Sequence, residues 1–480
     1  MANPYHLRLL KQDVQSWNAW RKKFPLTQPN LEGADLNGQD LRGINLINAN
    51  LIRVNLSLAN LEGAYLSGSD LSNAFLSEAN LTEANLSRAD LTRADLSFAR
   101  LGRATLIEAI LYQAIVIEAM VDHANFQYAD LRQANLSKTS LAGANGIKAN
   151  LTQAKLNGAC LQGTNLSRGF ISEASLRGAD LKGANLRKAD LSFANLSTAS
   201  LRGANLSKSI LIETNLRGTD LRQINLKGGQ CSKANFSRAD LAEADLTLAN
   251  LRQANLSEAG LEQSQLLQTN LSQANLTRSR LFNTNLADAI LTGACLEDVF
   301  PNSGTNLSRT ICDYVYLRDR EQERTPETGA FREGDLRDVF ITAQGTIDLI
   351  LPKDIYWAAL TYALQWLQRE YQPMRIQRLE HKTDGTLLLR LSMAPEIDKA
   401  QLQQDIWRVY EEHYRLLGPV MIDDQQPSHP FSDSLLLLDA QQYGHQEVIN
   451  RLFDSLAVMM AALMPKIEPL GIYSSAMTDT

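Results

Sequence analysis

The chain has 480 residues, of which 44% are hydrophobic, and a formal net charge of −6; this length allows two or more domains. The charge is uneven, because residues 31–300 carry 25 basic and 26 acidic side chains whereas residues 301–480 carry 17 and 26. A nearly neutral middle region argues against bulk electrostatic binding of nucleic acid.

The four cysteines are scattered and contain no Cys-x-x-Cys pair. This argues against a disulfide framework or a zinc site and indicates a reducing compartment. No run of 18 apolar residues is present, and no apolar segment follows the basic residues near the N-terminus. The sequence therefore predicts no membrane span and no signal peptide, and we expect a cytoplasmic protein.

Residues 4–24 have the pattern of one amphipathic helix. Apolar side chains recur there at three- and four-residue spacing: Leu7, Leu10, Val14, Trp17 and Trp20. The segment precedes a repeat whose first coil would expose strand edges and an apolar interior. We therefore predict that residues 1–30 form a cap, with a helix that docks a partner as the alternative.

Residues 31–300 repeat the five-residue phrase x-Ala-Asx-Leu-x in constant register, from Leu31 to Leu296. A period of five fits neither an α-helix nor the two-residue alternation of a strand. It suits a chain that turns a corner every five residues, with Ala and Leu inward. Four corners would close a coil of about 20 residues, and such coils would stack at about 4.8 Å.

The segments GADLNGQDL, SEANLTEANL and TRADLSFARL match the pattern A(D/N)LXX. In them the chain resembles the pentapeptide repeat family, in particular cyanobacterial members with an appended C-terminal α/β domain. The resemblance implies a mainly β fold, a right-handed quadrilateral parallel β-helix. It also implies kinship with members that bind gyrase through an acidic surface mimicking DNA, a surface that the near-neutral repeat of this chain lacks.

Departures from the Leu position indicate local packing. Phe126 and Gly146 both occupy it and are 20 residues apart, so we expect them on the same side of adjacent coils. We predict that the Phe126 ring fills the space that Gly146 leaves.

Two groups of outward residues are candidate contact regions. The first is an apolar belt, since exposed apolar patches often mark interfaces; the alternative is that such residues simply suit a β-surface. Its members are Ile107, Ile110, Tyr112, Ile115, Ile117 and Met120.

The second group is basic and spaced by 20 residues. A first basic ladder comprises Lys148, Arg168, Lys188 and Lys208, and a second comprises Lys182, Arg202 and Arg222. An anionic partner, either an acidic protein surface or a phosphate backbone, is one interpretation. A solvated face with local ion pairs to nearby aspartates is the other.

We predict that the repeat ends at residues 301–304, PNSG, which have turn chemistry. Residues 301–334 should form an exposed linker, and the first part of this linker should cover the last coil. Residues 335–417 have the pattern of an α-β-β-α domain. We expect a helix from Leu336 to about Leu351, in one or two pieces, and a helix at about 354–371. A hairpin around Asp384-Gly385 and a helix over 398–416 should follow.

Residues 418–480 form a predicted extension with a methionine-rich helix at about 445–464, whose apolar face is too short to span a bilayer. Core packing or self-association is the main interpretation, which makes the C-terminal region a candidate homodimer contact. Docking of a partner helix or a membrane surface is the alternative.

No motif indicates catalysis, a cofactor or a metal. The six histidines are dispersed, and no phosphate-binding, dinucleotide-binding or nucleophile-elbow motif is present. We therefore predict that the chain is not an enzyme and is a non-catalytic, regulatory protein-interaction scaffold. Two alternatives are DNA-mimic regulation of a topoisomerase, and enzyme activity confined to the C-terminal domain near Trp357 or His381.

Overall fold

The computed structural model describes residues 1–417 apart from 303, 319–320, 333–334, 344–345, 352–354, 372–373, 382–386, 394–396 and 398. The chain divides into two compact units, Met1–Ala343 and Gln344–Thr480. The predicted turn at Asp384-Gly385 and the predicted helix at 445–464 lie outside the described residues.

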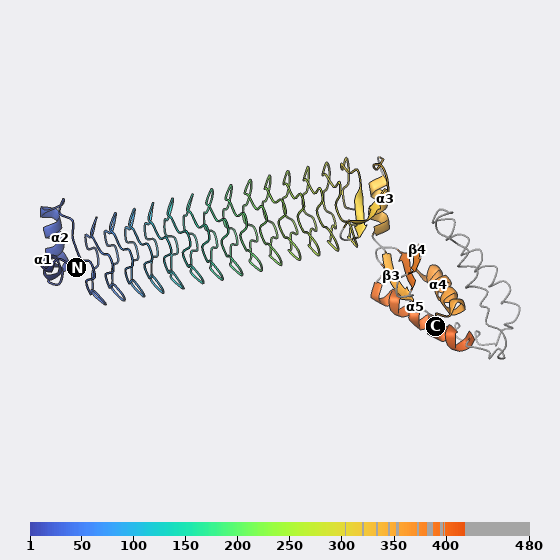
Figure 1. Ribbon diagram of the computed structural model, residues 1–480, viewed down its shortest axis with the longest axis horizontal. Helices are drawn as coiled ribbons and strands as arrows, with labels where there is room; N and C mark the ends of the chain where they lie inside the picture. Colours follow the sequence, from blue (N-terminus) through green and yellow to red (C-terminus); the bar gives the residue numbers. More distant parts are fainter. Residues whose placement is uncertain are drawn as a thin grey trace, which may run out of the picture. The chain divides into compact units, whose positions relative to one another are not determined.

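The repeat forms a coil that stacks on itself along the first unit (Figure 1). Parallel bridges join each residue that precedes the Leu position to the residue 20 positions later, from Asn30 with Asn50 to Arg280 with Phe300. The inward Leu and Ala side chains are buried in one continuous core. The prediction of a four-cornered coil of 20 residues is confirmed.

In the repeat 149–153, all five peptide N–H groups find acceptors. The N–H of Ala149 donates to the carbonyl three residues earlier at 3.0 Å, and that of Asn150 donates to the previous coil at 2.9 Å. The N–H groups of Leu151 and Gln153 donate to the next coil at 2.6 and 2.9 Å. The last one, on Thr152, donates to Oδ1 of Asn150 at 3.1 Å. Asparagine or aspartate before Leu therefore supplies an acceptor that the coil backbone lacks.

Two helices, α1 (Pro4–Leu10) and α2 (Val14–Lys23), stand where the sequence predicts one. The break falls at Asp13, whose carboxylate accepts from the N–H of Ser16 at 2.6 Å and so caps α2. This short-range capping signal was missed because the apolar spacing continues across it. The prediction of a single helix is wrong at this point.

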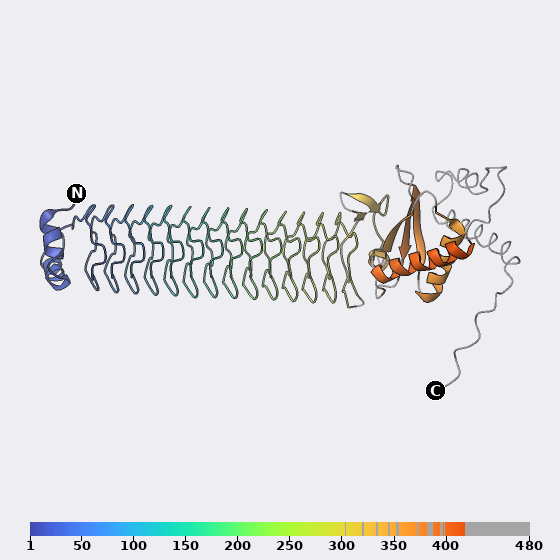
Figure 2. The same cartoon turned by 90° about the horizontal axis from the view of Figure 1, so that it is seen from below.

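The N-terminal helices lie beside the first coils (Figure 2). Helix α2 forms hydrogen bonds to these coils through polar side-chain atoms. The indole Nε1 of the fully buried Trp17 donates to the carbonyl of Asn45 at 2.7 Å. Arg21 donates to the carbonyl of Ile47 at 2.9 Å. Trp17 also belongs to the same core cluster as the repeat leucines. The helix therefore satisfies carbonyls of the first coils and adds apolar surface to the start of the core.

The coil continues past residue 300, so the prediction that it ends at 301–304 is wrong. Bridges join Asn285 with Asn306 and Cys295 with Tyr316, a spacing of 21 residues. One inserted residue between Phe300 and Asn306 shifts the register, and the inward positions then resume one residue later. The shift hid this last turn from a search in constant register.

Residues 315–343 add ordered elements to the first unit, where the sequence predicts a linker followed by a separate domain. Strands β1 (Val315–Arg318) and β2 (Gln322–Thr325) pair antiparallel, and α3 (Asp335–Ala343) follows. Buried Val315 and Phe340 belong to the core cluster of the coil. Apolar burial thus ties both the hairpin and α3 to the first unit.

The second unit contains β3 (Thr346–Leu351), α4 (Trp357–Glu370), β4 (Arg375–His381), β5 (Leu387–Ser392) and α5 (Lys399–Leu417). Its antiparallel sheet has the order β3-β5-β4, and both helices contribute to one core with it. The predicted helix over 336–351 is wrong in its second half. There Leu349 and Leu351 are buried and Ile350 is exposed, which is the alternation of a strand.

Phe126 and Gly146 lie in contact, as predicted. A Cβ atom placed on Gly146 would meet the edge of the Phe126 ring, 2.8 Å from Cδ2 and closer to the rest of the edge. The prediction that the ring occupies the space over Gly146 is confirmed.

Gly146→Leu is therefore expected to destabilise the β-helix by about 1–3 kcal/mol through overpacking. Adding Phe126→Leu, which restores leucine at both positions, should recover most of the loss. Denaturant unfolding of the two single variants and the double variant measures both effects. Additive losses in the double variant would show that the two residues do not share one space.

His6 links α1 to the start of the coil, because its Nδ1 accepts the N–H of Asn30 at 3.1 Å. Burial lowers the pKa of His6 below its ordinary value of 6.5. Protonation would occupy Nδ1 and leave the Asn30 N–H without its acceptor.

Neutral His6 should stabilise the folded state fully above pH 6.5. This stabilisation should decline as the pH falls toward and through its lowered pKa, because the unfolded state takes up the proton first. Hydrogen exchange at the Asn30 amide, corrected for the intrinsic rate, should accelerate over this range. His6→Gln is the control and should abolish the pH dependence. An unchanged profile in this variant would exclude His6 as the cause.

Candidate interaction surfaces

The coil has four sides, one for each repeat of a turn. Side 1 carries Leu31 and every twentieth residue after it, and sides 2, 3 and 4 begin in the same way from Leu36, Leu41 and Leu46. Residues 20 apart on one side form a column with a rise of about 4.8 Å per coil. Sides 2 and 4 face opposite directions.

The apolar belt encircles one coil. Its members are distributed as follows: Ile107 on side 4, Ile110 and Tyr112 on side 1, Ile115 and Ile117 on side 2, and Met120 on side 3. Ile110 and Ile115 are 40% exposed and Met120 is 52% exposed. A flat partner could contact at most one or two of these sides, so the belt does not form one docking patch.

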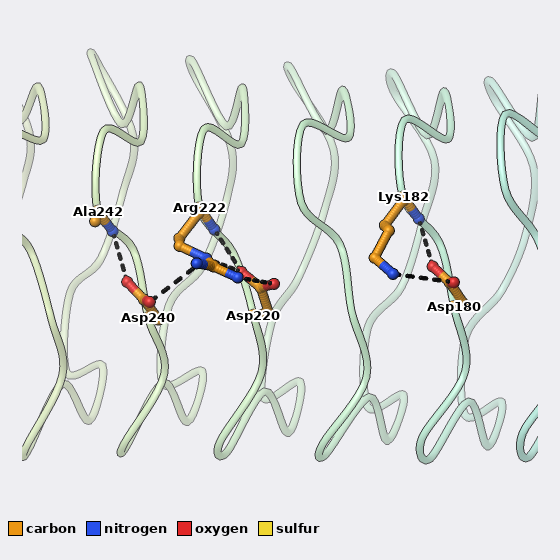
Figure 3. Close-up of polar contacts among 6 residues, drawn as sticks. All are labelled: Asp180, Lys182, Asp220, Arg222, Asp240 and Ala242. Atoms are coloured by element: carbon orange, nitrogen blue, oxygen red, sulfur yellow. Dashed lines mark hydrogen bonds and ion pairs between the residues drawn. The ribbon is translucent and has the colours of Figure 1, made fainter.

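The second basic ladder lies on side 3, where aspartates neutralise two of its cations. Lys182 Nζ lies 3.3 Å from Asp180 Oδ2. Arg222 lies 2.8 Å from Asp220 and 3.6 Å from Asp240 (Figure 3). The hydrogen bond from Arg222 lowers the pKa of Asp220 below its usual range. For these residues the structure supports local ion pairs.

The first basic ladder lies on side 4. Lys148 Nζ lies 5.0 Å from the centre of the Tyr128 ring. Among the described residues, no ion pair joins Arg168, Lys188 or Lys208 to a carboxylate. The first ladder therefore keeps a positive field that the second one largely loses.

Two further cations on side 4 were missed in the sequence. Arg187 and Lys227 each stand one residue before the ladder position of their repeat, and both are exposed. With Lys208 they line an open hollow of about 490 Å³. Gly228, which occupies the ladder position there, has no side chain to fill it. Sorting the outward residues by side, at intervals of 20, would have revealed them. We call these six residues the cationic strip: Lys148, Arg168, Arg187, Lys188, Lys208 and Lys227.

A second group of exposed side chains lies on side 2, nearer the N-terminus. Leu58, Phe75 and Phe98 are 56%, 52% and 53% exposed. Glu78 follows Leu58 in its column, and Asp95 follows Phe75. The same sorting by side would have found this group, whereas reading along the chain scatters it over several repeats. We call it the acidic-aromatic patch: Leu58, Phe75, Glu78, Asp95, Phe98 and Ile115.

The described residues contain few groups suited to catalysis. Within the described part of the chain, no group of three or more His, Cys, Asp or Glu side chains could hold a metal ion. The cysteines are free, and burial raises the pKa of Cys312 to about 12. The side chains of Trp357 and His381, near which an enzyme site was considered, lie outside the described residues.

No described helix is long and apolar enough to cross a membrane.

A family model described as pentapeptide repeats matches segments within residues 30–168, 171–228 and 234–298, more than half of the chain. The chain belongs to the pentapeptide repeat family. Its stacked coil is therefore the right-handed β-helix of pentapeptide repeat proteins, and the resemblance seen in the repeat sequence is confirmed.

Solved structures of other pentapeptide repeat proteins are similar to this chain. HetL from the cyanobacterium Nostoc sp. strain PCC 7120, involved in heterocyst differentiation regulation, is 31% identical over 45% of this chain and 92% of its own, with a TM-score of 0.39. Rfr23 from the cyanobacterium Cyanothece 51142 is 31% identical over 26% of this chain and 64% of its own, with a TM-score of 0.11.

QnrB1, a plasmid-mediated fluoroquinolone resistance protein, is 18% identical over 36% of this chain and 91% of its own, with a TM-score of 0.30. No curated protein sequence matches the chain.

Arg222→Gln should raise the pKa of Asp220 toward its ordinary value, because the strongest hydrogen bond to that carboxylate is removed. The melting temperature should hardly change, since exposed ion pairs contribute little to stability. Carboxyl-labelled NMR titration and thermal unfolding measure the two effects. A large fall in melting temperature would contradict the assignment of this pair as a local surface contact.

Proposed function

We propose that this pentapeptide repeat protein is a non-catalytic protein-interaction scaffold with a regulatory role. The observation that carries the proposal is the first basic ladder, a column of cations on side 4 without carboxylate partners among the described residues. The belt residues on adjacent sides 1 and 2 are a further candidate contact, and the second unit is a candidate for docking or dimerisation.

The backbone supports this role because it holds the ladder in a fixed geometry. Lys148, Arg168 and Lys188 have φ values of 60°, 58° and 58°, in the left-handed region. Their N–H groups donate to the next coil at 2.9–3.1 Å, so the column cannot slip. A partner would meet charges whose backbone positions are already ordered, which lowers the entropic cost of binding.

The ends of the β-helix are proposed to be covered and therefore not to serve as interaction surfaces. At the N-terminal end, α2 donates hydrogen bonds to coil carbonyls through Trp17 and Arg21. At the other end, Val315 and Phe340 extend the core into β1 and α3. Such caps prevent end-to-end strand pairing and leave the four sides as the main exposed surface of the β-helix.

The charge of side 4 argues against the DNA-mimic alternative. A surface that mimics DNA must be negative, since the duplex carries about one charge per 1.7 Å of its axis. The longest unbroken run of like charges in one column of this β-helix, Lys148 to Lys208, is positive instead. Inhibition of topoisomerase supercoiling at sub-micromolar protein would nevertheless revive this alternative.

The scaffold function predicts capture of a protein partner from the native lysate by the full chain. Lys188→Glu with Lys208→Glu should lose a partner bound at side 4. Ile110→Lys with Ile115→Lys and Ile117→Lys should lose one bound at the belt. Mass spectrometry of the captured proteins, with folding checked by circular dichroism, gives the result.

Arg53→Glu with Arg93→Glu is the matched control, because both residues are exposed and lie on side 1. The control should keep every partner. If all baits retain the same proteins, neither the ladder nor the belt is an interaction surface.

A further inference from the structure

The charges on opposite sides of the β-helix are complementary. On side 4, residues 125–228 include six cations, those of the cationic strip, and no carboxylate. On side 2, residues 35–118 include four carboxylates and no lysine or arginine. One of the four, Glu118, pairs with Lys138 at 3.0 Å. No ion pair within the described residues engages Glu78 or Asp95.

The acidic-aromatic patch has two kinds of group that receive cations. Carboxylates attract lysine and arginine directly, and aromatic rings attract them through the negative face of the ring. The chain already makes such ring contacts within itself, with Lys148 at 5.0 Å from the Tyr128 ring and Arg132 at 5.6 Å from the Tyr112 ring. Phe75 and Phe98 are about half exposed and free to make the same contact with another molecule.

The spacing of the two surfaces matches because one fold generates both. Columns on side 2 and columns on side 4 rise by the same distance, about 4.8 Å per coil. When a carboxylate of one molecule faces a cation of another, the following coils of the two molecules therefore stay in register over the whole contact. The patch extends over four coils, from Leu58 to Ile115, and the strip over five, from Lys148 to Lys227.

Nucleic acid fits the strip less well. Proteins that bind single strands combine cations with aromatic rings on which bases stack. In the described residues 145–228 of side 4 no aromatic side chain is present. Tyr128, the ring that precedes the strip on side 4, is already covered by Lys148.

We propose that a second copy of this chain docks side by side, with the acidic-aromatic patch of one copy on the cationic strip of the other. The inference rests on the proposed role of the β-helix sides as interaction surfaces, and it names the partner of one of them. Because the two surfaces differ, the contact is heterologous. In a dimer, one copy still has a free cationic strip and the other still has a free acidic-aromatic patch. Association should therefore continue beyond a dimer into short staggered arrays.

Charge-swap variants test the contact. The strip variant is Lys188→Glu with Lys208→Glu, and the patch variant is Glu78→Lys with Phe98→Lys. All four positions are the left-handed fifth position of a repeat, where the native chain already places Glu173 and Lys138. The substitutions therefore keep a backbone that both residue types tolerate.

Sedimentation velocity of the purified full-length chain is the measurement. At 50 mM salt the wild type should show a weight-average sedimentation coefficient that rises with concentration, and 500 mM salt should remove the rise because charges are screened within about 3–5 Å. Each variant alone should stay monomeric under both conditions. An equimolar mixture of the two should associate again, because the unchanged patch of the strip variant fits the unchanged strip of the patch variant, and the two reversed surfaces are complementary as well.

The control is Arg53→Glu with Arg93→Glu, which makes the same charge change at the same repeat position on side 1. It should associate like the wild type. Wild-type monomer at every concentration, association that persists in the strip variant, or a mixture that stays monomeric would each overturn the proposal. Because purified protein alone is measured, these results leave the capture of other partners, and with it the scaffold function, to be judged separately.

Discussion

The structure depends on one constraint, that the peptide N–H groups of each five-residue repeat must find acceptors, four of them on the coil backbone. Three N–H groups of each repeat bond to neighbouring coils and one closes the turn; where Asx precedes Leu, its side chain satisfies the fifth, as Asn150 does for Thr152. A buried donor without an acceptor would cost about 1–3 kcal/mol. This requirement explains the preference for Asx before Leu, and the backbone bonds between coils fix the rise for every outward column.

Because the rise is fixed, side-chain chemistry accumulates by side and not along the chain. The second basic ladder lies beside Asp180 and Asp220 on its own side, and its field is largely cancelled. The first ladder lies one side further on, where asparagines occupy the equivalent column from Asn145 to Asn225. The difference between a neutral surface and a charged one is thus a matter of which residue stands before Leu.

The repeat could be predicted from the sequence because it depends on local, periodic choices, and the contact of Phe126 with Gly146 followed from counting 20 residues. Other features lacked such a signal. Helix α2 begins where Asp13 accepts the N–H of Ser16, a contact that apolar periodicity does not report. The last turn was hidden by a single inserted residue, and α3 joined the first unit through the burial of Phe340, a tertiary effect. The candidate surfaces were only partly found, because belt members adjacent in sequence point in four directions.

The fifth position of each repeat is left-handed, and in most repeats a residue other than glycine occupies it. Such a residue costs roughly 1 kcal/mol relative to a relaxed backbone. The coil tolerates this cost because the N–H of that same residue bonds to the next coil, as Lys188 does at 3.0 Å. The side chain there projects outward and takes no part in the core, so its identity is free to vary without loss of the fold. Lys188, Lys208, Glu78 and Phe98 all stand at this position, which places the proposed contacts at the site where the β-helix constrains the backbone most and the side chain least.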